Sequence, residues 1–282
     1  MHEQLRRIVR SELRSALQAL DGDAPDDAGI YEARKSVKKT RAVLRLLREP
    51  LASDYSDENA RLQTVARTLA SLRDADATLD TLRQLHAQYP AVVSPRVVRE
   101  VSRGLRTRKR RADAKVEPIV RRAKGALLVC CDSVPDHVEG TGDFRAARAG
   151  AVACYRRART AYRGLALDAE AAAFHEWRKR IKDHWYHVRL FAPLPNGPRS
   201  RSVTLRRLEQ CLGDDHDLAT LRAILLDGDD RYGDARTRTL LLGSIMRGQT
   251  SLRQRALVLG ARIFAPSPKD FKASVTHWWR ER

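Results

Sequence analysis

The sequence predicts an all-α protein built from two four-helix bundles that are related by a pseudo-twofold axis. Helical periodicity dominates its 282 residues, and alternating strand patterns are scarce. The same series of helical segments occurs twice along the chain, at an offset of 143 to 144 residues. Hydrophobic residues make up 43% of the chain, which is enough for an ordinary globular core. A duplicated set of helices with such a core predicts two bundles.

The first half is expected to contain four helices. It opens with an amphipathic helix over residues 2–20, followed by a second helix over 29–48. A third helix contains the segment 69–76, and a long Arg-rich helix over 95–128 closes the half. Clusters of Pro, Gly and polar residues separate these helices, at 21–29, 50–57 and 89–95.

The second half repeats this order. Its helices are expected over 144–165, over 171–191, around the segment 212–219 and over 234–264. Helix-breaking clusters of Pro, Gly and polar residues lie at 193–200, 227–234 and 266–269. The terminal segment, with Trp278 and Trp279, is expected to pack against the rest of the protein. The longest breaker, 133–143, is expected to link repeat 1 (about 1–130) to repeat 2 (about 143–282). Because neither half need be stable alone, residues 1–282 are treated as one domain.

Helices 29–48 and 171–191 carry the same cationic stripe. A helical wheel places an apolar arc on each helix: Ala33, Val37, Thr40, Leu44 and Leu47 on the first, and Trp177, Ile181, His184, Val188 and Phe191 on the second. The stripe borders this arc: Arg34, Lys38, Arg41 and Arg45 on the first helix, and Arg178, Lys182, Trp185 and Arg189 on the second. Like charges at this spacing destabilise a helix unless an anion neutralises them. The stripe therefore predicts a groove or channel that binds an anion. The alternative is a solvated face whose aliphatic stems cover the core.

The charge balance points to a polyanionic partner. The chain has 54 Lys and Arg against 35 Asp and Glu, a net charge of +19, and both halves share it. This surplus attracts nucleic acid, an anionic membrane surface or polyphosphate. Five of the ten Lys residues lie on the two stripe helices: Lys35, Lys38, Lys39, Lys179 and Lys182. Because Lys is a compact point charge, this placement favours a site that surrounds a flexible anion.

Other functional classes find little support in the sequence. The four Cys residues have no CxxC or zinc spacing and are expected to be core residues in a reducing compartment. No signal peptide or membrane-spanning run occurs, so a cytoplasmic protein is expected. There is no P-loop and no GxSxG motif, so neither enzymatic activity nor a cofactor is expected. His184 and His187 share a helix face, but no third ligand lies at a useful spacing, since His175 points elsewhere. We therefore expect these histidines to lie at the surface or to support other polar residues, and we expect no metal site.

A second motif is also duplicated. Leu69–Asp76 corresponds to Leu212–Ala219, and the second copy contains Asp214, Asp215 and Asp217 beside His216. Three carboxylates could bind Mg²⁺. The alternative is that Asp74 and Asp217 orient Arg or Lys side chains by ion pairing.

Together, in order and in duplicate, these motifs resemble the CHAD family, the conserved histidine α-helical domain, over nearly the whole chain. The carriers of the resemblance are Phe174–Lys179 with Lys182, Leu212–Leu218, and their weaker first copies Tyr31–Lys35 with Lys38 and Leu72–Asp76. The resemblance implies two four-helix bundles around a basic central cavity that binds inorganic polyphosphate, with association to polyphosphate granules. The site residues it implies, together with the stripes, are Arg34, Lys35, Lys38, Arg41, Arg45, Arg73, His175, Arg178, Lys179, Lys182, Arg189 and His216.

The chain departs from the family pattern in its first repeat. Tyr31 stands at the position of the family histidine, and Ala70 replaces a glycine. A role that needs two symmetric histidines is therefore in doubt, whereas charge-based binding is unaffected. Only the second repeat is expected to gain a histidine cation on mild acidification.

Two other functions remain open at this point. Non-specific nucleic-acid binding is favoured by the basic cluster Thr107–Arg111, although no recognition helix or aromatic stacking platform is evident. An interaction scaffold is the third alternative. Oligomeric state and chain-length preference are not encoded in any pattern that we recognise.

Overall fold

The structure is a computed structural model. It describes residues 2–22, 25–139, 141, 143–194, 197–227 and 230–280. Side chains are described for all of these except His2, Ser71, Arg73, Asp74, Ala75, Asp230 and Arg280.

Every regular element in the described part of the chain is helical, which confirms the predicted all-α class. The α-helices are α1 (His2–Ala19), α2 (Asp27–Leu46), α3 (Arg48–Thr68), α4 (Ala70–Gln88), α5 (Pro95–Asp113), α6 (Val116–Val138), α7 (Phe144–Arg163), α8 (Ala171–Phe191), α9 (Arg199–Asp227), α10 (Ala235–Phe264) and α11 (Pro268–Arg280). A short 3₁₀ helix, η1 (Asp230–Tyr232), precedes α10. None of the helices, over the residues described, is both long and apolar enough to cross a bilayer.

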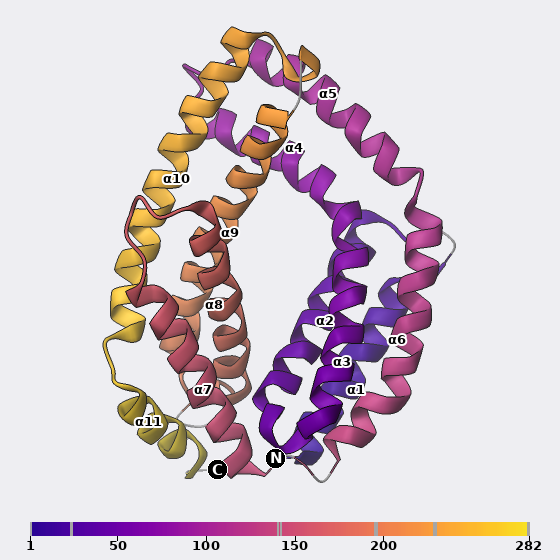
Figure 1. Ribbon diagram of the computed structural model, residues 1–282, viewed down its shortest axis with the longest axis vertical. Coiled ribbons are helices and arrows are strands. Elements are labelled where there is room, and N and C mark those ends of the chain that lie inside the picture. Colours follow the sequence, from indigo (N-terminus) through magenta and orange to yellow (C-terminus); the bar gives the residue numbers. More distant parts are fainter. Residues whose placement is uncertain are drawn as a thin grey trace.

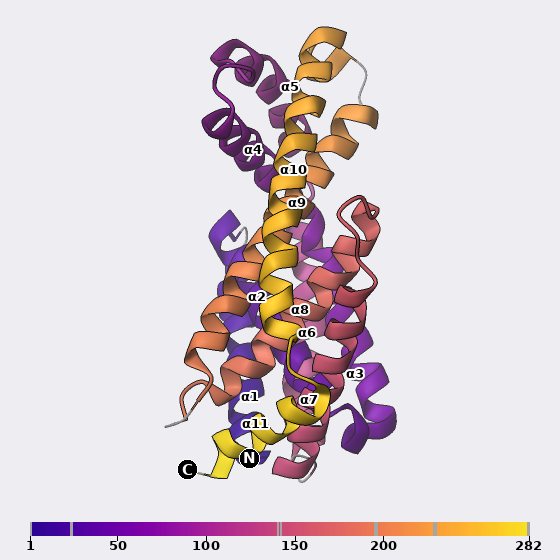
Figure 2. The same cartoon turned by 90° about the vertical axis from the view of Figure 1, so that its left-hand side faces the viewer.

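The helices form two groups that meet along the middle of the molecule. In Figure 1, α1, α2, α3 and α6 lie on the right, and α7 to α11 lie on the left. Within each group, neighbouring helices pack against one another, with α1 on α2 and α6 and with α9 on α8 and α10. The groups contact each other mainly through α2, which packs on both α7 and α8. Helices α4 and α5 extend from the first group to the far end of α9, α10 and η1 (Figure 2).

Buried apolar residues from both groups belong to one continuous core. Two polar contacts also join the groups: Arg45 Nη1 lies 2.8 Å from Asp183 Oδ1, and His187 Nε2 donates to the Ala42 carbonyl at 2.7 Å. At Gly150 in α7, an added Cβ would collide with the backbone carbonyl of Leu46. The absence of a side chain there therefore allows α7 to pack directly on α2.

The helix starts follow from the breaker segments. Asp26, Ser94, Asp143 and Asp234 each accept a hydrogen bond from a backbone N–H in the first turn of α2, α5, α7 and α10, respectively. Such caps satisfy backbone groups that have no partner inside the helix. Pro95 follows the Ser94 cap, at a position where a missing N–H has no cost.

Three expected boundaries were wrong. Segment 50–57 is helical within α3, because Pro50 falls in the first turn, where proline is tolerated, and the bend is confined to Ala52 at φ 46°. The long helix expected over 95–128 is two helices: α5 ends at Asp113, and α6 begins at Val116, so that Pro118 falls in the first turn of α6, where proline is tolerated. Helix α6 then continues through Pro135 to Val138, so it covers half of the expected linker 133–143.

Candidate functional site

A cavity of about 960 Å³ lies between α2, α4, α8 and α9. Its described lining includes seven cationic side chains and three carboxylates. The cations are Arg34, Lys35, Lys38, Arg178, Lys182, Arg189 and Arg206, and the carboxylates are Glu209, Asp214 and Asp217. The two stripe helices, which are 144 residues apart in sequence, thus place their cations in one space.

The stripe helices face this space because of their apolar arcs. All ten predicted arc positions on α2 and α8 are buried, which confirms the helical-wheel prediction. Burial of one arc fixes the rotation of each helix about its axis. The adjoining cations then lie at the edge of the packed face, where α2 and α8 leave room between them.

Lys38 is the most strongly perturbed of these cations. Burial, followed by the positive charge of Lys182, lowers the pKa of Lys38 to about 7. Arg34 and Arg178 lower it further, and Glu209 acts in the opposite direction. Lys38 is therefore only partly protonated at neutral pH when no anion is bound. A bound anion restores the ordinary pKa by replacing the lost solvation.

Lys182 differs from Lys38 because it has a carboxylate partner. Its Nζ lies 2.7 Å from Oε1 of Glu209, and both side chains are largely buried. Burial lowers the pKa of Lys182, and the Glu209 charge opposes this change. Glu209 is thus an internal counter-ion that neutralises the charge of Lys182 in the empty cavity.

His216 lines the cavity and is paired with His175, which is not among the lining residues. Their Nδ1 atoms lie 3.1 Å apart, and their ring centroids lie 4.3 Å apart. Burial, followed by the charge of Arg178, lowers the pKa of His216 to about 4. Burial, followed by the charge of Lys179, lowers the pKa of His175. A hydrogen bond between two Nδ1 atoms needs one protonated and one unprotonated nitrogen, and the lowered pKa values favour the neutral form of both rings.

Tyr31 stands where the second repeat has His175. It lines the cavity, its exposed fraction is 44%, and its ring lies 5.9 Å from Lys35 Nζ. The two repeats therefore differ at the cavity: one contributes Tyr31, and the other contributes His216 with its partner His175.

Not every predicted site residue lines the cavity. Arg41 Nε donates to Asn59 Oδ1 at 3.1 Å, and Arg45 pairs with Asp183, so both take part in helix packing below the cavity. Lys179 is exposed and pairs with Glu176 at 3.0 Å. The side chains of Arg73 and of Asp74, expected to orient a cation, lie outside the described residues.

The acidic motif on α9 divides between two environments. Asp214 and Asp217 line the cavity, and burial raises the pKa of Asp214 to about 6. Asp215 instead points to α10, where it accepts from Gln249 at 3.1 Å and from Arg253 at 2.9 Å. The three carboxylates therefore do not converge, and the described residues contain no group of three or more metal-binding side chains.

His184 is fully buried, as its place on the predicted apolar arc implies, and so is His187, which was expected to lie at the surface or to support other polar residues. Their positions on the apolar arc of α8 place them in the core. Burial lowers the pKa of His187 to about 4, and the Nε2–H of His187 binds the Ala42 carbonyl. Neither ring nitrogen of His184 has a partner among the residues described.

Sequence analysis missed the contribution of α9 upstream of the His216 motif. Arg206 and Glu209 line the cavity together with Ser202 and Gln210. The sequence contains a pattern that indicates this face of α9. Positions at helical spacing along it all line the cavity: 202, 206, 209, 213, 216 and 220. Extending the wheel backward from His216 would have found them.

Comparison with known proteins identifies similar sequences and folds. The family model described as "CHAD domain" matches residues 4–226. The structure of PptA from Streptomyces chartreusis aligns with a TM-score of 0.69 and 18% identity, over 94% of this chain and 99% of that one. The CHAD domain from the plant Ricinus communis aligns with a TM-score of 0.58 and 16% identity, over 100% of this chain and 93% of that one. Among curated proteins, none matches this chain in sequence.

Proposed function

Because this chain belongs to the CHAD domain family, we propose that it binds inorganic polyphosphate in the cavity between α2, α4, α8 and α9. One observation carries the proposal: cations from the stripes of both repeats line a single cavity. A chain of phosphates presents repeated negative charge and no bases. It therefore suits a space lined by seven cations. Three aromatic side chains, Tyr31, Trp185 and Tyr186, also line the cavity, and the rings of Trp185 and Tyr186 stack on each other at 5.3 Å, so competition with single-stranded DNA decides between the two ligands.

The arrangement of the helices supports the same function. We interpret α1, α2, α3 and α6 as one four-helix bundle and α7 to α10 as the other, with the basic cavity between them. A ligand with several phosphate groups can contact Arg34 and Lys38 from one bundle and Arg178 from the other at the same time. This geometry favours a chain over a single phosphate.

The mixed use of Lys and Arg also fits a chain ligand. Lys38 and Lys182 are the cavity cations whose pKa values are lowered by burial. A compact ammonium group can donate to whichever phosphate oxygen is nearest, whereas the planar Arg34 and Arg178 guanidinium groups can each bind two oxygens.

The proposal is one of binding without catalysis, and it includes association with polyphosphate granules in the cell. A granule exposes long polyphosphate chains, so a cavity that prefers long chains would bring the protein to its surface. Localisation of a fluorescent fusion in cells with and without polyphosphate synthesis would test this part.

Calorimetry tests the binding itself. We expect long-chain polyphosphate to bind far more tightly than pyrophosphate, because only the long chain contacts both bundles. Log affinity should fall linearly with log salt concentration as counter-ions are released. Equal affinity for pyrophosphate and the long chain would refute the proposal, as would stronger binding of single-stranded DNA of matched charge.

A further inference from the structure

A second cationic groove lies on the other side of α4. It has a volume of about 590 Å³ and is lined by Leu72, by residues of α5 and the start of α6, and by Arg231 and Tyr232. Its cations are Arg103, Arg108, Arg111, Lys115 and Arg231. No carboxylate occurs among its described lining residues. We call this feature the α5 groove.

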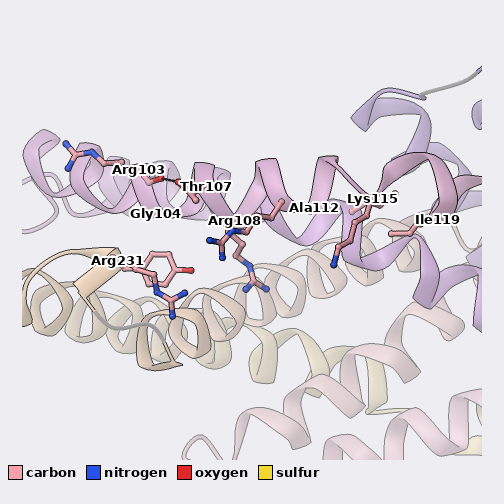
Figure 3. A pocket seen from close by; sticks show the side chains of 11 residues that line it. Arg103, Gly104, Thr107, Arg108, Ala112, Lys115, Ile119 and Arg231 are labelled. Atoms are coloured by element: carbon pink, nitrogen blue, oxygen red, sulfur yellow. Dashed lines mark hydrogen bonds between the residues drawn. The ribbon is translucent and has the colours of Figure 1, made fainter.

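The groove depends on one close contact between α5 and η1. An added Cβ at Gly104 would collide with the Arg231 carbonyl and would lie 2.8 Å from the Tyr232 ring. Glycine at this position therefore lets η1 pack on α5. In Figure 3, Arg103 of α5 and Lys115, which lies between α5 and α6, mark the two ends of the row of cations, and Arg231 lies on the facing segment.

The two faces of α5 differ in how their cations are paired. Lys109, which is not in the groove, lies between carboxylates of Asp27, Asp76 and Asp113 at 2.8 to 3.4 Å. The cations in the groove contrast with it: within the described part of the chain, no ion pair is formed by Arg103, Arg108, Arg111 or Lys115. A row of cations with no counter-ion in a concave surface attracts an anion.

The spacing of the row favours an extended anion. Arg103 and Arg111 are eight residues apart on α5, which corresponds to roughly 12 Å along the helix, and Lys115 follows beyond its end. A compact anion cannot contact cations distributed over that length. The one aromatic ring in the lining, Tyr232, is buried, so the groove offers no exposed platform on which bases could stack.

The groove and the cavity flank the same helix. Leu72 of α4 lines the groove, and Ala77 and Thr78, about one and a half turns further on, line the cavity. A helix with its side chains is about 10–12 Å across. A polyanion that leaves the cavity therefore has to pass around only one helix to reach the groove.

We propose that the α5 groove is a second phosphate-binding site, which holds a further segment of a long polyphosphate chain. The choice of polyphosphate as the ligand rests on the proposed function of the cavity. With this second site, binding depends on the length of the polyphosphate chain. Short chains fill the cavity alone, and long chains occupy both the cavity and the α5 groove.

Matched variants of α5 test the proposal. Arg108→Ala with Arg111→Ala removes two groove cations, and Arg106→Ala with Arg110→Ala removes two exposed cations of the same helix outside the groove. Both pairs change the net charge equally and replace exposed helical residues by alanine, so both proteins should fold. Circular dichroism and thermal melting check this.

Binding of tripolyphosphate, long-chain polyphosphate and single-stranded DNA is then measured by competition. For the groove variant we expect about fivefold weaker binding of the long chain than for the control, because each exposed contact contributes modestly. The dependence of log affinity on log salt should be shallower by about one to two. Tripolyphosphate binding should be unchanged.

Equal long-chain affinity in the groove variant and the control would overturn the α5 site and leave the cavity proposal standing. A loss of DNA binding without a loss of polyphosphate binding would overturn the choice of ligand. A cavity variant, Lys38→Ala with Lys182→Ala, separates the two sites. If it binds tripolyphosphate as the unchanged protein does, the cavity proposal fails, while the α5 comparison still decides the groove. If the unchanged protein binds no polyphosphate, both proposals fall.

Discussion

Replacing Lys38 by arginine should remove most of the pH dependence of polyphosphate binding. In the empty cavity, burial and the charge of Lys182 lower the pKa of Lys38 to about 7. Phosphate oxygens around the ammonium group favour its charged form, so the bound pKa returns toward the ordinary value of about 10.4. Binding therefore takes up a proton above pH 7, and affinity falls as pH rises.

The size of the effect follows from the protonated fraction of Lys38. With a pKa of about 7, roughly half of the empty protein carries the charge at pH 7 and about 1% at pH 9. The affinity of the unchanged protein should thus fall by up to roughly 50-fold across this range. Arginine stays charged throughout, so Lys38→Arg should change by no more than about threefold.

The other groups that face Lys38 titrate mainly outside this range or act in the same direction. The pKa of Asp214 is about 6 and that of His216 about 4, so both have largely lost their protons by pH 7. The pKa of Lys182 is lowered from its ordinary value, and Glu209 opposes that change. The pH profile of a Lys182→Arg variant measures how much of the pH dependence of binding comes from Lys182.

Calorimetry in two buffers of different ionisation enthalpy gives the proton uptake directly. We expect uptake of about half a proton at pH 7 and nearly one at pH 8 from Lys38, and its loss in Lys38→Arg. Parallel pH profiles for the two proteins, or binding without proton uptake, would show that the environment of Lys38 does not control the site.

Three further predictions concern the cavity and its support. Lys38→Ala with Lys182→Ala should weaken long-chain binding at least about tenfold, because two charge-assisted contacts are lost, while the melting temperature without ligand holds or rises. Glu209→Gln should strengthen binding several-fold in the same assay, since the carboxylate 2.7 Å from Lys182 no longer competes with phosphate; unchanged affinity would contradict this. Gly150→Ala should destabilise the protein by about 1–3 kcal/mol through its collision with an α2 carbonyl, whereas Gly125→Ala, which has nothing within 4 Å, should stabilise it by about 0.5–1 kcal/mol in urea unfolding.

The structure changes one expectation about pH. The second repeat was expected to gain a histidine cation on mild acidification, which would strengthen binding between pH 8 and pH 6. The two rings are hydrogen-bonded, the pKa of His216 is about 4, and burial lowers the pKa of His175 below its ordinary value, so this pair gains less charge on mild acidification without ligand than ordinary histidines would. Lys38 is the group whose pKa lies within this pH range.

Local sequence was sufficient for the helices and for their buried faces. Periodicity on α2 and α8 identified the apolar arcs correctly, because the same 3.6-residue repeat that forms a helix also aligns the side chains that must leave water. Boundaries were less predictable where proline occurred. Pro50 lies within a first turn and Pro135 within a last turn, and whether a helix tolerates proline there depends on its surroundings.

The composition of the site was decided by tertiary structure. On a wheel, Arg34, Lys38, Arg41 and Arg45 form one stripe, yet the first two line the cavity and the last two pack against Asn59 and Asp183. The contribution of Arg206 from α9 was equally hidden. The sequence by itself determines which side of each helix is cationic. Which part of that side meets an open space depends on where neighbouring helices lie along its length, and contacts between segments more than a hundred residues apart set those positions.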